Sequence, residues 1–172
     1  RPEPAFTYTI VMMRSIFSLK ASRKPWRISE MQLDEIDDLY HGVILDHYKN
    51  PRNLYPLTEA QIRAKELNPF CGDEVAIQLK LSCAGVIQQV GSQAQGCFIC
   101  RASASLLSEA LEGMNLGDAE LLNRSFRVMM AGEKLSSTEC STLGDLAALK
   151  AVRKFPVRIK CAMLAWATLE EG

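Results

Sequence analysis

Alternating apolar and polar residues predict a small sheet in the middle of the chain. In residues 74–83 every second side chain is apolar, which is typical of a half-buried strand. A short turn containing glycine leads into residues 86–95, which we expect to pair with it as an antiparallel hairpin. Residues 62–67 form a third candidate strand. The apolar face of the central strand comprises Val75, Ile77, Leu79 and Leu81.

Helical periodicity flanks this sheet on both sides. Residues 34–49 repeat apolar side chains at three- and four-residue spacing, and acidic residues occupy their first turns. Residues 133–141 are polar and are expected to be a loop. Because the strands are grouped, the pattern predicts an α+β fold, with a small antiparallel sheet of about three strands packed against several helices. The helices expected after the sheet are 102–111, 118–130, 143–152 and 157–169.

The charge balance separates a leader from the remaining chain. The 172 residues contain 20 basic and 20 acidic side chains, and this balance gives no reason to expect nucleic-acid binding. Residues 1–30 hold six basic and two acidic side chains, whereas residues 31–172 hold 14 and 18. We expect residues 1–30 to be a poorly ordered basic extension and residues 31–172 to be the functional domain. An organellar transit peptide is the alternative for the leader, whose apolar run is too short and interrupted to span a membrane.

Thiols are the main candidate chemistry, since the chain has six cysteines and two histidines. Cys71 lies in a tight turn before a predicted strand, Cys97 follows the hairpin, and Cys161 lies early in the last helix. Ends of segments can converge on one site. Asp73 shares the turn of Cys71, and Gly72 between them allows a sharp bend. Three thiolates and one carboxylate suit tetrahedral zinc, and the same set could hold iron in a sulfide cluster.

The remaining thiols and the histidines have simpler interpretations. Cys83, at the end of a strand, is expected to be a small buried residue, and Cys140, in a loop, to be either such a residue or simply exposed. Cys97 and Cys100 form a C-x-x-C pair, which could be redox-active or half a zinc knuckle, but no second pair completes a knuckle. The two histidines lie six residues apart on the first predicted helix and do not share a face. We expect them to pack or to face solvent rather than to bind metal.

Three ordered motifs give the domain a family resemblance. Residues 68–73 read NPFCGD, residues 96–105 read GCFICRASAS, and residues 155–162 read FPVRIKCA. Together with residues 39–53, they resemble the U-type iron–sulfur cluster assembly proteins. The extra segment near residues 113–142 favours the SufU branch over the IscU scaffold branch. Lys160 also favours SufU, because the scaffold branch typically has histidine there, and the chaperone-recognition motif of the scaffolds is absent.

The resemblance implies a function and a ligand set. Cys71, Asp73, Cys97 and Cys161 would bind zinc, with iron or a transient 2Fe–2S cluster as the alternative. A pyridoxal-phosphate cysteine desulfurase of SufS type would donate persulfide sulfur to Cys71, and a downstream iron–sulfur scaffold would receive it. The protein would thus be a zinc-dependent sulfurtransferase in the cytoplasm. A scaffold that builds the cluster at the same ligands, and a purely structural zinc domain, are the competing hypotheses.

Two residues near the ligands have less defined roles. Arg158 lies three residues before Cys161, so it would share a helix face with that thiol. It would tune the site or aid docking, and an ordinary surface cation is an equal alternative. Cys100 stands where the resembled family commonly has serine. We expect it to be a neutral replacement of similar size.

Overall fold

The computed structural model describes residues 40–172. The predictions for the leader and for the first part of the helix over 34–49 lie outside the described residues. The remaining part of that helix has two segments. Tyr40–Ile44 form a π-helical turn, η2, which passes directly into the short helix α2, Leu45–Lys49.

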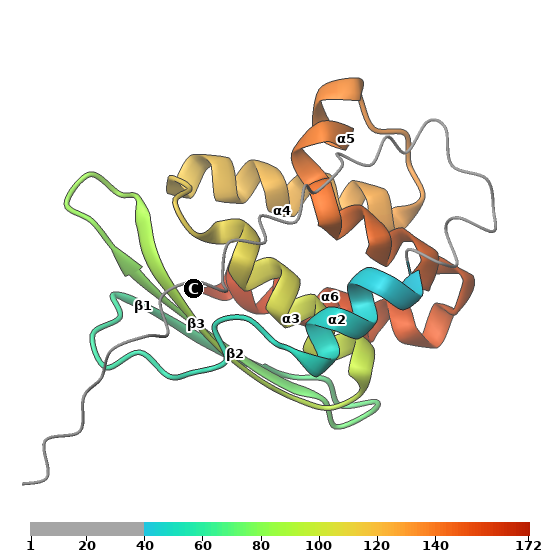
Figure 1. The fold of residues 1–172 in the computed structure, drawn as a ribbon, viewed down its shortest axis with the longest axis horizontal. Coiled ribbons are helices and arrows are strands. Elements are labelled where there is room, and N and C mark those ends of the chain that lie inside the picture. Colours follow the sequence, from blue (N-terminus) through green and yellow to red (C-terminus); the bar gives the residue numbers. More distant parts are fainter. Residues whose placement is uncertain (1–39) are drawn as a thin grey trace, which may run out of the picture.

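Three antiparallel strands form one sheet, as the alternation predicts (Figure 1). They are β1 (Ile62–Leu67), β2 (Glu74–Leu81) and β3 (Ile87–Gln95), and β2 lies between the other two. The strand expected to end at Cys83 ends two residues earlier, because the turn begins at Ser82, whose backbone N–H donates to the Val86 carbonyl at 2.8 Å. On the inner face of β2, the side chains of Val75, Ile77 and Leu79 are no more than 1% exposed.

The helices pack against one face of this sheet in two layers (Figure 1). The helices α3 and α6 contact the strands directly, and α2 packs on α3. The remaining elements, α4, α5 and the 3-10 helix η3, lie on the far side of this inner pair. The bounds are α3 Phe98–Leu111, α4 Leu116–Ala131, α5 Ser137–Leu143, η3 Gly144–Lys154 and α6 Pro156–Glu171.

The expected loop at residues 133–141 is wrong in its second half, where α5 begins. Ser136 and Glu139 form a capping box, in which each side chain bonds the other residue's backbone N–H. The helix expected over 143–152 is instead a 3-10 helix, and Gly144, with a φ of 49°, separates it from α5. α3 starts four residues earlier than expected, at Phe98.

A stacked aromatic pair fixes the helices at the centre of the core. The Phe126 and Trp166 rings lie 3.9 Å apart at an angle of 8°, and both side chains are fully buried. The Trp166 indole N–H donates to the Ser103 hydroxyl at 3.2 Å, and that hydroxyl donates to the Ala162 carbonyl at 2.6 Å. These contacts join α3, α4 and α6, so they fix the relative positions of the helices that carry Cys97 and Cys161.

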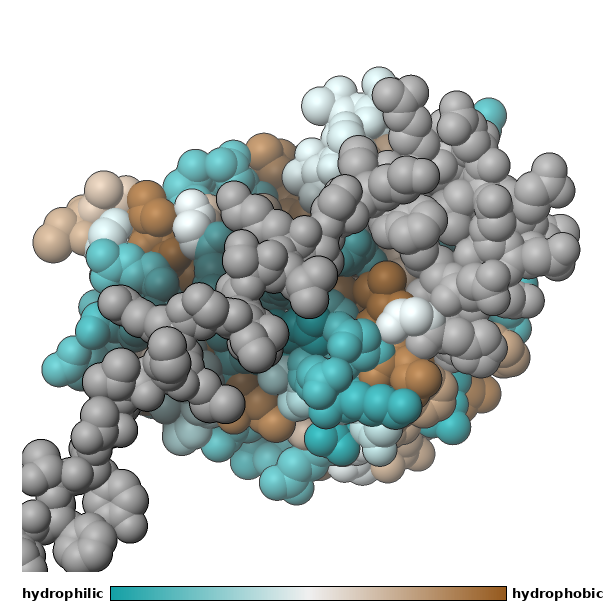
Figure 2. Space-filling model, in the orientation of Figure 1, coloured by the Kyte–Doolittle hydropathy of each residue, from teal (hydrophilic) through white to brown (hydrophobic). Residues whose placement is uncertain are grey.

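The outer surface mixes polar and apolar residues. Figure 2 shows hydrophilic residues over much of the coloured face, with apolar groups between them. Within residues 40–172, no helix combines the length and the apolar character needed to cross a membrane.

Candidate metal centre

The turn between β1 and β2 holds two of the predicted ligands in opposite environments. The Asn68 backbone N–H donates to the Asp73 carbonyl and the Gly72 N–H donates to the Asn68 carbonyl, both at 2.8 Å. Gly72 has a φ of +73°, which a residue with a side chain rarely adopts. The turn therefore exposes the Cys71 thiol and directs Asp73 inward, where it is only 3% exposed.

Cys97 meets the Asp73 carboxylate at the start of α3. It is the N-cap residue of that helix, and its backbone N–H donates to Asp73 Oδ1 at 3.2 Å. Gly96 precedes it with a φ of +148°, and a Cβ at this position would lie 2.8 Å from the Asp73 Cβ. A glycine is therefore required for the carboxylate to approach the backbone this closely.

Cys161 completes a group of three close ligand atoms. It lies in the second turn of α6 and is 1% exposed. Its sulfur is 3.9 Å from the Cys71 sulfur. One ligand atom each from Cys71, Asp73 and Cys161 all lie within 4.8 Å of one another. The fold therefore brings together residues that are 90 positions apart in the sequence, at spacings that a single ion could bridge.

The electrostatics of this group favour an ionised carboxylate. Burial of Asp73 opposes its ionisation, but hydrogen bonds from the Cys161, Cys71 and Cys97 thiols and from the Cys97 backbone outweigh it, so its pKa is lowered. Burial first, and then the contact with Asp73, raise the pKa of Cys161. Asp73 Oδ2 is buried and has no hydrogen-bond partner among the described residues. An unsatisfied carboxylate oxygen in a group that also holds two thiols fits a cation ligand site.

Cys97 and Arg158 lie beside this group rather than within it. The Cys97 sulfur is not one of the three mutually close atoms, although its thiol is a hydrogen-bond partner of both Asp73 and Cys161. Arg158 is exposed, and its pKa is raised by its charge interaction with Cys97 and by bonds to the Cys161 and Cys97 thiols. Its guanidinium is therefore beside the thiols, on the solvent side.

The other cysteines are outside the cluster. Cys100 is fully buried in α3, and burial raises its pKa to about 12. Cys83 is exposed, so the prediction that it is buried is wrong, because the strand ends before it. Cys140 lies half-buried in α5. His47 packs between helices: its Nδ1 is 2.9 Å from the Ser105 hydroxyl.

Sequence reasoning missed one contact at the site. The Lys160 ammonium lies 3.6 Å from the centre of the Phe70 ring. Each of these residues directly precedes a predicted ligand, Cys71 or Cys161. Their position in the two cysteine motifs was the available signal, but nothing in the sequence indicates that the two motifs meet.

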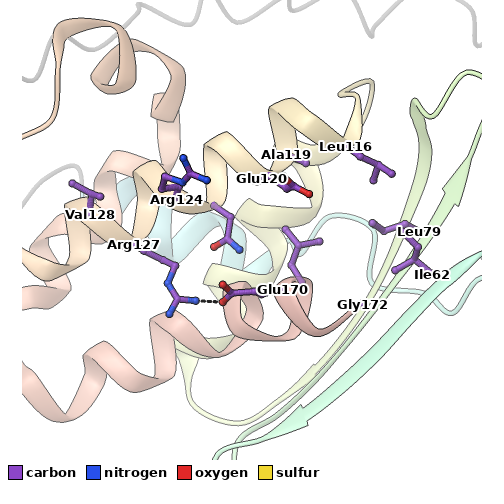
Figure 3. Close-up of a pocket in the computed structure, with 12 residues that line it drawn as sticks. Ile62, Leu79, Leu116, Ala119, Glu120, Arg124, Arg127, Val128, Glu170 and Gly172 are labelled. Carbon is purple, nitrogen blue, oxygen red and sulfur yellow. Dashed lines mark hydrogen bonds and ion pairs between the residues drawn. The ribbon is translucent and has the colours of Figure 1, made fainter.

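A separate hollow of about 610 Å³ lies between α4, α6 and the sheet (Figure 3). An ion pair between Arg127 and Glu170 crosses it. None of the predicted ligands lines this hollow. The hollow is therefore distinct from the candidate metal centre around Cys71 and Cys161.

Comparisons with known proteins agree with this fold and its motifs. The family described as the NifU-like N-terminal domain matches residues 39–162. A zinc-dependent sulfurtransferase, SufU of Bacillus subtilis, is 40% identical over 137 residues, which cover 80% of this chain and 90% of the relative. The iron–sulfur cluster assembly scaffold protein IscU of Streptococcus pyogenes is 34% identical, over 83% of this chain and 87% of the relative.

Solved structures show the same architecture. A crystal structure of a protein from Fervidobacterium islandicum, described as an iron–sulfur cluster assembly scaffold of the SUF system, superposes with a TM-score of 0.71. The two are 27% identical, and the match covers 78% of this chain and 96% of that one. The chain thus belongs to the family of NifU-like N-terminal domains.

Proposed function

We propose that this protein is a zinc-dependent sulfurtransferase that accepts persulfide sulfur for iron–sulfur cluster assembly. The single observation that carries the proposal is the closeness of an exposed thiol to a buried thiol and a buried carboxylate, one oxygen of which has no hydrogen-bond partner among the described residues. Cys71 is open to solvent, yet its sulfur lies 3.9 Å from that of Cys161 and close to the Asp73 carboxylate. A purely structural metal site would not need an exposed thiol among its ligands.

Cys71, Asp73 and Cys161 would hold the zinc ion, with Cys97 as the fourth ligand. The donor set of sulfur and carboxylate oxygen is one that zinc accepts. When bound, the ion keeps the cysteine ligands as thiolates at neutral pH. The closeness of Arg158 to Cys97 and Cys161 supports a role in balancing the negative charge of these thiolates.

The sulfur-transfer step is a thiol–disulfide type of exchange at Cys71. The Cys71 thiolate attacks the outer sulfur of a cysteine persulfide on a pyridoxal-phosphate cysteine desulfurase. A new S–S bond forms at Cys71 while the donor S–S bond breaks, and the donor cysteine leaves as its thiolate. The outer sulfur keeps its proton, so no external oxidant or reductant is consumed. Cys71 then carries the persulfide to a downstream scaffold.

A second candidate function is that of a scaffold that assembles a 2Fe–2S cluster at the same ligands. The similarity to proteins named IscU, over more than four-fifths of this chain for the Streptococcus pyogenes relative, favours it. In that case the cluster would be cargo, and the same four residues would bind iron rather than zinc.

Metal analysis combined with a desulfurase assay tests the proposal. The purified protein should contain one equivalent of zinc and should increase alanine production by a cysteine desulfurase. Cys71→Ala should abolish this stimulation with the fold retained, whereas Cys83→Ala, which removes another exposed thiol, should leave it unchanged. A labile cluster that transfers to an apo-ferredoxin, without stimulation of the desulfurase, would support the scaffold instead.

A further inference from the structure

The contact between Phe70 and Lys160 lies immediately beside the sulfur pair. The Phe70 side chain is 78% exposed, which is unusual for a phenyl ring. The Lys160 ammonium lies 3.6 Å from its centre, close enough for a cation–π interaction. Phe70 precedes Cys71 and Lys160 precedes Cys161, so the contact spans the same two segments as the sulfur pair.

The two segments differ in how firmly the fold holds them. Lys160 is part of α6, which packs on α3 and on two strands. The base of the Phe70 turn is closed by the bond from the Asn68 N–H to the Asp73 carbonyl, and the Phe70 and Gly72 N–H groups both donate to Asn68 within the turn. The side chains at its tip, Phe70 and Cys71, are exposed. At Gly72, the space that a side chain would occupy is empty. The exposed tip therefore has room to move while the base of the turn holds Asp73 in place.

We propose that Phe70 and Lys160 are positioning residues that act together as a latch on the Cys71 turn. The closed latch holds the tip against α6, with the Cys71 sulfur beside that of Cys161. When the ammonium leaves the ring, the tip swings outward and presents Cys71 to an incoming persulfide. The role in sulfur transfer rests on the proposed function, but the latch itself is a property of the turn and of α6.

A double-mutant cycle on the metal-free protein tests the latch. The readout is the rate at which iodoacetamide alkylates Cys71, followed by site-resolved mass spectrometry. Phe70→Leu keeps the lysine charge but removes the ring, so Cys71 should react about two- to fivefold faster, the factor that an exposed cation–π contact supplies. Phe155→Leu is the matched control, since Phe155 is also exposed near the start of α6, but no lysine among residues 40–172 lies over its ring. Its rate should equal that of the wild type.

The lysine substitutions separate the contact from simple charge effects. Lys160→Met removes a positive charge near the thiol as well as the contact, so its effect is measured both alone and in the Phe70→Leu background. If the latch exists, Lys160→Met should change the alkylation rate of Cys71 by different factors in the two backgrounds. Lys160→Arg should keep a rate close to that of the wild type, because a guanidinium also stacks on a ring. Equal factors for Lys160→Met in both backgrounds would refute the latch.

The desulfurase assay distinguishes failure of the latch from failure of the proposed function. If wild-type protein stimulates the desulfurase but the cycle shows no coupling, the latch is wrong and the function stands. If the cycle shows coupling without stimulation, the latch stands and the sulfurtransferase function is wrong. Circular dichroism of each variant confirms that the exposed substitutions leave the fold intact.

Discussion

Two polar clusters within the fold differ in how completely the chain satisfies their hydrogen-bonding groups. The helix-core network consists of His47, Arg52, Ser105 and Glu109. There, the Ser105 hydroxyl contacts His47 Nδ1 at 2.9 Å and accepts the Arg52 backbone N–H at 2.8 Å, and His47 Nε2 faces Glu109 at 3.5 Å. The thiol cluster consists of Cys71, Asp73, Cys97 and Cys161.

The thiol cluster is incomplete where the helix-core network is complete. Asp73 Oδ2 has no partner among the described residues, although burial without a hydrogen bond is costly. The network joins α2 and the loop after it to α3, so its role is to stabilise the fold. The cluster has the chemistry of a site that an external ion completes. The unsatisfied Asp73 oxygen indicates a binding site because it belongs to a group that also holds two thiols.

The largest expected effect is a difference in zinc affinity between a variant of the thiol cluster and a variant of the helix-core network. Asp73→Ala removes a proposed ligand, so zinc affinity should fall by more than about 100-fold, beyond the loss usual for groups that only support a ligand. Competition with a chromophoric chelator measures this affinity. Ser105→Ala should bind zinc as the wild type does. Equal affinities for wild type and Asp73→Ala would remove Asp73 from the ligand set.

Gly96→Ala should damage the thiol cluster through the backbone. The added Cβ would meet the Asp73 side chain and would be strained at a φ of +148°, so we expect a loss of about 2–4 kcal/mol in unfolding free energy. Zinc affinity should fall as well, because the carboxylate must shift. Gly113→Ala is a suitable control, since it shares a positive φ but has open space around it. If Gly96→Ala and Gly113→Ala lose the same unfolding free energy and both keep their zinc affinity, the close approach of Gly96 to Asp73 does not matter for the site.

Ser105→Ala should weaken the fold without affecting the metal. The substitution leaves the His47 ring and the Arg52 N–H without their shared partner. The unfolding free energy, measured by urea denaturation, should therefore fall by about 1–3 kcal/mol. Ser141→Ala, in an exposed position, should cost much less. An unchanged unfolding free energy in Ser105→Ala would show that water replaces the hydroxyl and that the network is not structural.

The smallest expected effect is a pH dependence from the helix-core network. Burial first, and then the nearby Arg52 charge, lower the pKa of His47 below its ordinary 6.5, although Glu109, Asp46 and Asp145 act in the opposite direction. The unfolded chain therefore binds the proton more tightly, and stability falls as the pH drops below about 6.5. The slope stays under about 1.4 kcal/mol per pH unit, the limit for one proton. Urea denaturation from pH 7.5 to about 5.5 measures it, and His47→Gln should flatten it. An equal slope in both proteins would assign the effect to other groups.

The sequence predicted an element correctly where its hydrophobic period and the turn residues beside it indicated the same structure. The period of two in β2 and the glycine turns on either side of the hairpin identified the sheet. The helix α5 was missed, although Ser136 and Glu139 carry the capping-box spacing in the sequence, because its seven residues are nearly all polar. The early start of α3 was missed because Phe98 and Cys100 read as part of a motif rather than as a first helical turn.

The sequence motifs suggested candidate ligands for the site, but not how their atoms lie relative to one another. The motif spacing suggested which thiols belong together, but long-range packing places Cys161 beside Cys71, while Cys97 stays outside the closest three. Burial of Asp73 and the orphaned Oδ2 are tertiary properties that no local pattern encodes. The same holds for the contact of Lys160 with Phe70.

The central claim is that Cys71 is the sulfur acceptor of a site held by Asp73 and Cys161. The most direct test is mass spectrometry of the zinc-loaded protein after incubation with a cysteine desulfurase and cysteine, with thiols trapped by alkylation. The account predicts one added sulfur atom on the peptide that contains Cys71, and none in Cys71→Ser. Added sulfur on Cys83 or Cys140 instead, with Cys71 unmodified, would contradict it.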